Sequence, residues 1–530
     1  MHTNAFQRFL ILGTILAGFI LPPAHAQETV PQPPESQEPR RILLHGKVVQ
    51  KDGSAKKRYV YIEDGVIQSV TYKRPKLLKG IRFVHEAGYI YPGLIDLHTH
   101  ITYNIMPVWG GAQSQFSNRF EWRKNEDYKN FRDIYKALTI PDFKFGLLLY
   151  DEIQALAGGT TLIQESGIID NESKDVTRRL VVRGTDFEDD LELNNGKKVA
   201  SSFEIFAPKA DGTFAAKDAL ESFAKRRSED KLQAYIVHLA EGRTGFLRTD
   251  QSFDPSCRAE FETLMAHPYF SDPENTPKPP VALIHSSGID PQNDAHINFL
   301  KTWNMGIVWS LVSNLLLYGD TLDIPTLLQK GVLIALGSDW SPSGSKHVLD
   351  EARMARFYLD MIAYPNPSPV SDAEIFQMMT TNAAQMIDHP RLGGIKPGNL
   401  ADLFVIEDPD PSVSPMKALF YTDVKYITMV MIRGRAVYGY EDRVRPLEPN
   451  VQLLPQIEGE PVLNKVVYMD PALNLNLEET IGKMEAHLKT LGVYRNNLLT
   501  STDKPYQERM FQLQQMIFNT FLAPRLKKKE

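Results

Sequence analysis

Short apolar runs alternate with longer helical stretches over residues 91–395, and this rhythm limits the fold more than any other feature of the chain. Such alternation is typical of parallel α/β folds, in which each helix returns the chain to the start of the next strand. Eight strands separated by helices predict a TIM-like (β/α)8 barrel. The predicted strands are residues 94–97, 161–164, 180–182, 200–206, 234–237, 281–284, 306–309 and 333–336.

Both flanks of this central segment have the pattern of β-structure. Residues 41–90 contain short alternating apolar runs with a turn at Asp64-Gly65, and Asp-Gly pairs are hairpin signals. Residues 396–450 contain similar runs on either side of Arg433-Gly434. We therefore expect one small composite β-domain, built from the two flanks of the barrel.

The last segment, residues 451–530, has apolar residues that recur at helical spacing. One series runs from Leu477 to Leu491 and another from Met510 to Phe521, and each series predicts an amphipathic helix. We expect this helical extension either to pack on the body of the protein or to join two copies of the chain in a homo-oligomer.

The first 26 residues have the pattern of a secretion signal. Arg8 precedes an apolar run that is short for a transmembrane helix, and Ala24-His25-Ala26 forms a small-x-small cleavage site. Residues 27–40 are rich in Pro, Gln and Glu, which predicts a disordered spacer. The sequence thus predicts an exported protein, periplasmic or secreted, without a stable membrane span after cleavage. An uncleaved membrane anchor is the alternative.

The composition argues against several classes of function. The net charge is −6, with acids and bases spread along the chain, which gives no sign of a nucleic-acid-binding surface. Cys257 is the only cysteine, so the chain forms neither an internal disulfide nor a Cys-rich zinc site. The expected partner is a small-molecule substrate.

Residues of metal-ligand type stand at or near the ends of several predicted strands. His98 and His100 end the first strand, and residues two apart in a strand point the same way, so both imidazoles project into one space. His238 follows the fifth strand, His285 the sixth and Asp339 the eighth. In a barrel of this kind the carboxyl ends of the strands converge on one site. Neighbouring imidazoles suit Zn, Fe or Ni.

Longer motifs surround these residues. They are Pro92-Gly-Leu-Ile-Asp-Leu-His-Thr-His100, Gly158-Gly-Thr-Thr161, Thr381-Asn-Ala-Ala384 and Gly394-Ile-Lys-Pro-Gly-Asn-Leu-Ala-Asp402. Together they resemble the motifs of the amidohydrolase superfamily of metal-dependent hydrolases, over roughly residues 42–440. Within that superfamily, His238-Leu-Ala-Glu241-Gly is similar to the branch that contains cytosine and guanine deaminases and triazine hydrolases.

The resemblance implies one divalent metal ion, with zinc favoured and iron as the alternative. The implied ligands are His98, His100, His238 and Asp339. A bound ion lowers the pKa of its water toward roughly 7, so a metal-bound hydroxide would attack an sp² carbon while Asp339 takes the proton. Glu241 would then protonate the leaving nitrogen, and His285 would bind or polarise the substrate. Two-metal members of the superfamily use a carboxylated lysine of the fourth strand. The predicted fourth strand has none, and Lys209 lies just beyond it.

Aromatic residues and arginines adjoin the predicted strand ends, where loops roof the site in this fold. Such side chains suit a flat or anionic substrate, and packing within the loops is the alternative for each of them. The candidates are Tyr103, Trp109, Trp122 and Arg123 after the first strand, Arg243 after the fifth, Trp309 at the seventh and Trp340 at the eighth.

Three hypotheses follow from these patterns. The first is an exported hydrolase of non-peptide C–N bonds, which deaminates a heterocycle or opens a cyclic amide. The second is a hydrolase of peptide-like or ester bonds in the cell envelope, which fits export from the cytoplasm. The third is a catalytically inactive barrel that serves as a binding module, although the presence of every implied ligand and of Glu241 argues against it.

Overall fold

The computed structural model divides the chain into Met1–Pro39 and Arg40–Glu530, and all described helices and strands belong to the second unit. The predicted secretion signal and residues 27–38 of the predicted spacer lie outside the described residues. None of the described helices combines the length and the apolar character that a membrane crossing requires. The structure describes residues 39–527 except 77–79, 101–102, 114, 141, 165–166, 170–175, 179–180, 187–188, 194, 247–253, 273–278, 408–409, 411, 456–462 and 496–502.

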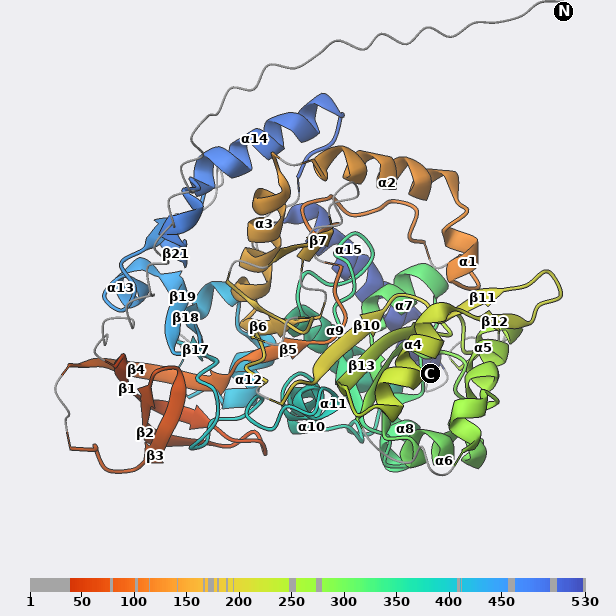
Figure 1. The fold of residues 1–530 in the computed structure, drawn as a ribbon, viewed down its shortest axis with the longest axis horizontal. Coiled ribbons are helices and arrows are strands. Elements are labelled where there is room, and N and C mark those ends of the chain that lie inside the picture. The colour runs from red at the N-terminus through yellow and green to blue at the C-terminus, as the bar shows by residue number, and fades with distance from the viewer. Residues whose placement is uncertain are drawn as a thin grey trace, which may run out of the picture. The chain divides into compact units, whose positions relative to one another are not determined.

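Parallel strands form the centre of the second unit, in the chain order expected from the alternation (Figure 1). They make two sheets, with the orders β5-β6-β9 and β10-β13-β14-β15-β16. An isolated parallel bridge between Thr99 and Asp339 joins the end of the first of these strands to the end of the last. The strands are β5 (Leu94–Asp96), β6 (Thr160–Ile163), β9 (Arg183–Gly184), β10 (Lys198–Ser202), β13 (Leu232–Leu239), β14 (Val281–His285), β15 (Met305–Trp309) and β16 (Ile334–Leu336).

Two of these strands differ from the predicted ones. The third strand is Arg183–Gly184, after the predicted residues 180–182, of which Leu180 lies outside the described residues. The predicted fourth strand at 200–206 is broken, because β10 ends at Ser202. Phe206 then begins a separate hairpin of β11 (Phe206–Pro208) and β12 (Phe214–Ala216).

A second, nine-stranded sheet contains strands from both flanks of the parallel strands, in the order β20-β21-β19-β18-β17-β4-β1-β2-β3. Strand β4 is parallel to β1 and antiparallel to β17, so the two flanks meet where β4 pairs with β17. Its strands are β1 (Arg41–Val49), β2 (Ala55–Glu63), β3 (Val66–Thr71), β4 (Ile81–Pro92), β17 (Leu403–Ile406), β18 (Ile427–Ile432), β19 (Arg435–Tyr440), β20 (Val451–Leu453) and β21 (Lys465–Tyr468).

The sequence predicts a helical extension over residues 451–530. The structure differs, because the first part of this segment forms strands. Strands β20 and β21 extend the nine-stranded sheet, because β21 pairs with β19. The predicted helices follow as α14 (Leu477–Thr490) and α15 (Lys504–Ile517). Leu477, Ile481, Met484 and Leu488 of α14 are buried, whereas Leu491 lies beyond its end and is exposed.

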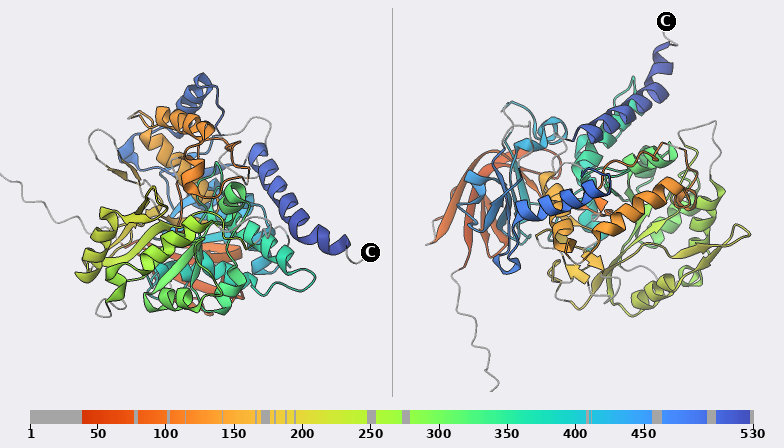
Figure 2. Two further views of the ribbon diagram at one scale, coloured as in Figure 1. Left: turned by 90° about the vertical axis from the view of Figure 1, so that its right-hand side faces the viewer. Right: turned by 90° about the horizontal axis from the view of Figure 1, so that it is seen from above.

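These two helices pack on the body of the same chain. Helix α14 contacts α2 (Glu126–Leu138) and α3 (Lys144–Ala157), and α15 contacts α9 (Val348–Ala363). Figure 2 shows α15 leading outward to the described end of the chain. The remaining α-helices of the described residues are α1 (Arg119–Trp122), α4 (Asp218–Ser228), α5 (Pro255–Met265), α6 (Asp294–Thr302), α7 (Leu311–Tyr318), α8 (Ile324–Gln329), α10 (Asp372–Met378), α11 (Thr381–Met386), α12 (Pro415–Tyr421), α13 (Glu441–Val444) and α16 (Ala523–Lys527).

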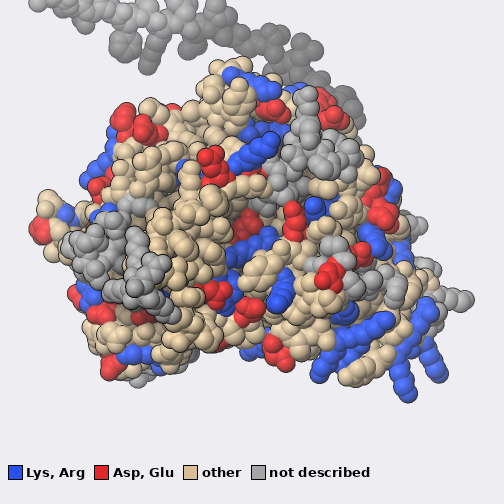
Figure 3. Space-filling model, turned by 180° about the vertical axis from the view of Figure 1, so that it is seen from behind, with Lys and Arg blue, Asp and Glu red and all other residues tan. Residues whose placement is uncertain are grey.

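The surface carries charges of both signs. On the face shown in Figure 3, basic and acidic side chains are interspersed over most of the area, and a group of basic side chains lies at one edge. This mixture matches a net charge of −6 distributed along the chain.

Candidate active site

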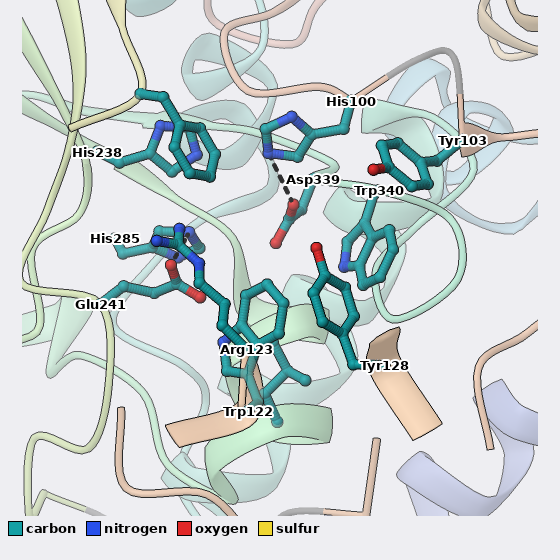
Figure 4. A pocket seen from close by; sticks show the side chains of 12 residues that line it. His100, Tyr103, Trp122, Arg123, Tyr128, His238, Glu241, His285, Asp339 and Trp340 are labelled. Carbon is teal, nitrogen blue, oxygen red and sulfur yellow. Dashed lines mark ion pairs between the residues drawn. The ribbon is translucent and has the colours of Figure 1, made fainter. Parts of the chain in front are cut away.

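Three histidines and one aspartate bring their ligating atoms together at the carboxyl ends of the parallel strands. His98 Nε2 lies 3.3 Å from His100 Nε2 and 3.0 Å from His238 Nε2. Asp339 Oδ1 lies 3.4 Å from His98 Nε2 and 3.5 Å from His100 Nε2. Figure 4 shows His100, His238 and Asp339 facing one cavity. Imidazole nitrogens and a carboxylate at this spacing are the donors that zinc and related divalent ions prefer.

The first strand and the loop after β16 are fixed to each other behind these donors. The carboxyl group of Asp96 accepts hydrogen bonds from Ser338 Oγ at 2.5 Å and from the backbone N–H of His98 at 3.2 Å. His98 Nδ1 lies 2.7 Å from Ser310 Oγ, at the start of α7. Gly337 leaves the room that His98 needs, since a Cβ there would approach the His98 Cβ to 2.3 Å. Such supporting contacts fix the orientation of a ligating imidazole.

The backbone departs from strand geometry where two of the site residues stand. His285 and Asp339 both have a φ of 61°, in the left-handed region that residues other than glycine rarely adopt. Regular alternation along β14 would place His285 on the same side as Leu283, and the left-handed conformation redirects it. Strain of this kind persists where the surrounding structure enforces it, and it is common at functional sites.

The protonation states of the donors suit a bound cation. Burial holds the pKa of His98 and of His238 well below the usual range, and the neighbouring histidines push in the same direction. Both imidazoles are therefore neutral near pH 7, which is the form that binds a metal. Burial raises the pKa of Asp339, while His100 and His285 oppose the rise. The donor set thus fits a divalent ion.

A chain of hydrogen bonds orients Glu241 toward the same cavity. Trp122 Nε1 donates to the Tyr318 hydroxyl at 2.8 Å, and that hydroxyl donates to Glu241 Oε1. The other oxygen, Oε2, lies 3.8 Å from His285 Nε2. Burial alone would raise the pKa of Glu241, but His285 and Arg123 more than offset it, so the pKa is lowered. His285 is held in turn by Asn314, whose Oδ1 lies 2.9 Å from His285 Nδ1.

The cavity has a volume of about 200 Å³ and is lined by both predicted and unpredicted residues. Its lining includes most of the candidate residues, which are His100, Tyr103, Trp122, Arg123, His238, Glu241, His285, Asp339 and Trp340. His98 lies directly behind them and is fully buried. Five aromatic side chains and six polar or charged ones line the cavity, which suits a small flat ligand that carries polar groups.

Three predicted substrate contacts do not line this cavity. Trp309 is fully buried on the other side of β15, where its Nε1 donates to Thr321 Oγ1 at 2.7 Å and its ring packs on Tyr358 of α9. Arg243 Nε donates to the backbone oxygen of Tyr318, 3.2 Å away. Trp109 packs behind the cavity residue Trp340, and their ring centroids are 6.2 Å apart.

Three lining residues were missed by the sequence analysis, namely Tyr128, Phe203 and Leu317. Phe203 directly follows the end of β10, so its position at a strand end could have revealed it. Tyr128 lies on α2 and Leu317 on α7, and only the packing of these helices brings them to the site. Lys209 is exposed in the turn between β11 and β12, away from the cavity.

Arg123 is fixed at the cavity by a shared carboxylate. Its Nη1 donates to Glu204 Oε1, and Lys217 Nζ donates to the other oxygen of Glu204 at 2.5 Å. The guanidinium lies 4.6 Å from the ring centroid of Phe203. Among the described residues, Arg123 Nη2 is buried without a hydrogen-bond partner, so it is available to a hydrogen-bond acceptor on a ligand.

Neutral histidines, a carboxylate and an oriented proton carrier at the ends of parallel strands define a metal-dependent hydrolase site. The model of the amidohydrolase family matches residues 89–437, and the chain belongs to this family. It is a metal-dependent hydrolase acting on non-peptide carbon–nitrogen bonds, and the relatives that it resembles in sequence include deaminases.

Similar proteins of known function are deaminases and a triazine hydrolase. The chain is 21% identical over 395 residues to the 5'-deoxyadenosine deaminase of Methanosarcina mazei, covering 71% of this chain and 86% of the relative. It is 24% identical over 400 residues to the 5-methylthioadenosine/S-adenosylhomocysteine deaminase of Pyrococcus furiosus, covering 71% and 88%.

Two solved structures have a similar fold. An adenosine deaminase of Xanthomonas campestris with bound zinc has a TM-score of 0.54 at 16% identity, covering 85% of this chain and 98% of that one. A triazine hydrolase of Arthrobacter aurescens has a TM-score of 0.57 at 15% identity, covering 85% and 99%.

Proposed function

We propose that this protein is an exported, zinc-dependent hydrolase that removes an amino group from a small flat heterocycle, with opening of a cyclic amide as the alternative reaction. The observation that carries the proposal is the position of Glu241, which lines the cavity with Asp339 and lies 3.8 Å from His285. Deaminases of adenosine derivatives among the relatives support the same reaction class. The two parallel sheets, joined through Thr99 and Asp339, support one TIM-like barrel as the scaffold.

A single ion held by His98, His100, His238 and Asp339 would lower the pKa of a bound water toward about 7. The candidate donors form two overlapping groups with ligand atoms within 4.8 Å of one another, His98 with His100 and His238, and His98 with His285 and Asp339. Zinc suits imidazole and carboxylate donors and is bound in the adenosine deaminase of similar fold, and iron is the alternative. The exposed position of Lys209 supports one ion rather than two.

Glu241 supplies the proton transfer. Because its pKa is lowered, it is ionised in the resting enzyme and must take up a proton before it can donate one. Tyr318 holds one carboxyl oxygen, which leaves the other for the leaving nitrogen. His285, held by Asn314, polarises the substrate at the same point. General acid–base catalysis of this kind typically contributes about 10²–10⁴-fold.

The walls of the cavity favour a small planar substrate over the peptide-like or ester substrate of the alternative hypothesis. Aromatic rings such as Trp122 and Trp340 stack on planar ligands. Arg123 Nη2 would donate to a carbonyl or ring nitrogen of the substrate. Drug-sized ligands occupy cavities of roughly 300–1,000 Å³, and about 200 Å³ is small by comparison.

The proposal also covers the location and the oligomeric state of the enzyme. The N-terminal pattern around Arg8 and Ala24-His25-Ala26 supports export to the periplasm or the medium. A homo-oligomer through the C-terminal helices is supported by the exposed side chains of Phe511 on α15 and Leu526 on α16.

The first experiment compares metal content and ammonia release in three forms of the mature chain: wild type, His238→Ala, and the control His487→Ala on α14, whose side chain does not line the cavity. We expect about one equivalent of zinc or iron in wild type and in the control, and most of it lost in His238→Ala. Assays would use heterocyclic amines for ammonia release and cyclic amides for ring opening.

The outcomes separate the hypotheses. Ammonia release that depends on His238 supports deamination, and ring opening without ammonia supports the cyclic-amide reaction. Two equivalents of metal would contradict the single-ion site. Bound metal with no turnover of either panel, or turnover of esters or dipeptides alone, would overturn the proposed reaction.

A further inference from the structure

Helix α15 lies outside the residues that match the family model, yet it contacts the loops that build the cavity wall. The family match ends at residue 437, and α15 begins 67 residues later, at Lys504. Two loops are involved. One follows β5 and carries Tyr103 and Trp109, and the other follows β16 and carries Trp340.

A buried ion pair joins α15 to the loop after β16. Lys346 Nζ donates to Asp503 Oδ2 at 2.5 Å, and the two side chains are 1% and 4% exposed. Asp503 also caps α15, because its other oxygen accepts from the backbone N–H of Tyr506. The backbone N–H of Lys346 donates in turn to the Tyr506 hydroxyl at 3.2 Å. The start of the helix and the end of the loop therefore fix each other.

The loop itself is compact, so this attachment reaches Trp340. The backbone N–H of Gly344 donates to the oxygen of Trp340 at 2.7 Å, and that of Ser345 donates to the oxygen of Ser338 at 2.9 Å. Ser345 Oγ donates to Glu351 at 2.5 Å. A displacement of Lys346 would thus be transmitted to the turn that carries Trp340.

Arg509, one turn further along α15, holds the second loop. Its Nη2 donates to the backbone oxygen of Trp109 at 2.8 Å, and the Trp109 N–H donates to the oxygen of Pro342 at 2.8 Å. Trp109 links the two loops in this way. Its ring centroid also lies 6.2 Å from that of Trp340 and 6.4 Å from that of Trp122, both of which line the cavity.

We propose that Arg509, Asp503 and Lys346 are positioning residues, through which the C-terminal helix sets the place of the aromatic wall and hence the substrate specificity of the site. The binding of a flat substrate depends on where Trp122 and Trp340 stand. The helix determines this from a segment outside the family match, without touching the substrate. The inference deepens the proposed function and rests on it for its kinetic readout.

The test compares Arg509→Met with Arg525→Met as the matched control. Both arginines lie in the C-terminal extension and donate to backbone oxygens of the body, but Arg525 contacts Ile362 and Tyr364 at the end of α9, outside the two cavity loops. Misplacement of binding groups by about 1 Å can cost up to about 100-fold, so we expect kcat/KM of Arg509→Met to fall roughly 10- to 100-fold, mainly through KM. Metal content and the activity of Arg525→Met should stay at the wild-type level, and Arg509→Lys should recover part of the loss.

Quenching of tryptophan fluorescence by acrylamide gives a readout independent of activity. Of the five tryptophans of the chain, Trp122 and Trp340 line the cavity and Trp109 packs behind them, so Arg509→Met should increase quenching and Arg525→Met should not. Unchanged quenching and KM in Arg509→Met, or equal changes in both variants, would overturn the proposal. If no substrate is turned over by the wild type, the proposed function fails, and the quenching comparison still decides whether α15 positions the wall.

Discussion

The hairpins of the nine-stranded sheet and the carboxyl ends of the parallel strands use the same unusual backbone conformation for different purposes. In the sheet, Asp64 and Arg433 have φ of 47° and 53°, and each is followed by a glycine of positive φ in a turn between two strands. At the parallel strands, His285 and Asp339 both have φ of 61° and are buried at the cavity. The turn itself demands the conformation in the first case, whereas the second serves the site.

The two regions also differ in how they treat buried charge. Lys465 in β21 donates to the backbone oxygens of Ile427 and Val424 at 2.9 and 3.2 Å, and Asp402 at the edge of β17 is paired with Arg183. At the cavity, the carboxylates of Glu241 and Asp339 lie among histidines, with His285 Nε2 3.8 Å from Glu241 Oε2 and His100 Nε2 3.5 Å from Asp339 Oδ1. We therefore expect substitutions in the sheet to change stability, and substitutions at the cavity to change activity.

The largest expected effect is on activity. Glu241→Gln keeps an acceptor for Tyr318 but cannot carry a proton, so kcat should fall about 10²–10⁴-fold. The free energy of unfolding should change by no more than about 1 kcal/mol, because the hydrogen bond is retained. Steady-state kinetics and urea denaturation measure the two quantities, and Glu262→Gln, at an exposed glutamate, is the control. If kcat falls by less than about tenfold, Glu241 is not the proton carrier.

The next effect is on stability, at the junction of the two regions. Arg183 Nε and Nη2 donate to the two oxygens of Asp402 at 2.6 and 3.1 Å, and both side chains are buried. Arg183→Met leaves the carboxylate buried without its partner, which should cost about 3–5 kcal/mol of unfolding free energy. Urea denaturation checks this value.

The double variant Arg183→Met/Asp402→Asn sharpens this prediction. It removes the uncompensated charge while the Asn side chain can still accept from the backbone N–H of Arg433, which Asp402 Oδ1 accepts at 2.9 Å in the native chain. Much of the lost stability should return. Equal losses in the single and double variants would mean that packing, and not the buried charge, determines the cost.

The sequence was informative where a local pattern decides the structure. His98 and His100 could be placed together because two residues in a strand share a face, and Asp64-Gly65 marked a hairpin that the structure contains. The sequence did not predict which strands pair when they are far apart in the chain. The addition of β21 to the nine-stranded sheet depends on contacts with β19, which no local pattern encodes.

The site shows the same limit. Trp309 ends a strand, as the ligands do, but it points to the helix layer, because Ile307 and Trp309 pack on one side of β15 and Val308 packs on the other. Tyr128 reaches the cavity only through the packing of α2. The contact of Arg509 with Trp109 joins residues 400 positions apart, and the periodicity of α15 predicts only that the helix has a buried face.

The smallest expected effect concerns pH and Lys465 in the sheet. Burial lowers the pKa of this lysine to about 7, far below its value of about 10.4 in the unfolded chain. Between these two values the unfolded chain binds more protons, so this group makes the protein more stable as the pH rises. From pH 7 to pH 9 the free energy of unfolding should rise by about 2 kcal/mol relative to Lys465→Met.

Urea denaturation at both pH values measures this difference, and Lys483→Met, which replaces an exposed lysine, is the control. The same pH dependence in wild type and Lys465→Met would show that Lys465 stays protonated in the folded sheet, held by the two backbone oxygens that it contacts.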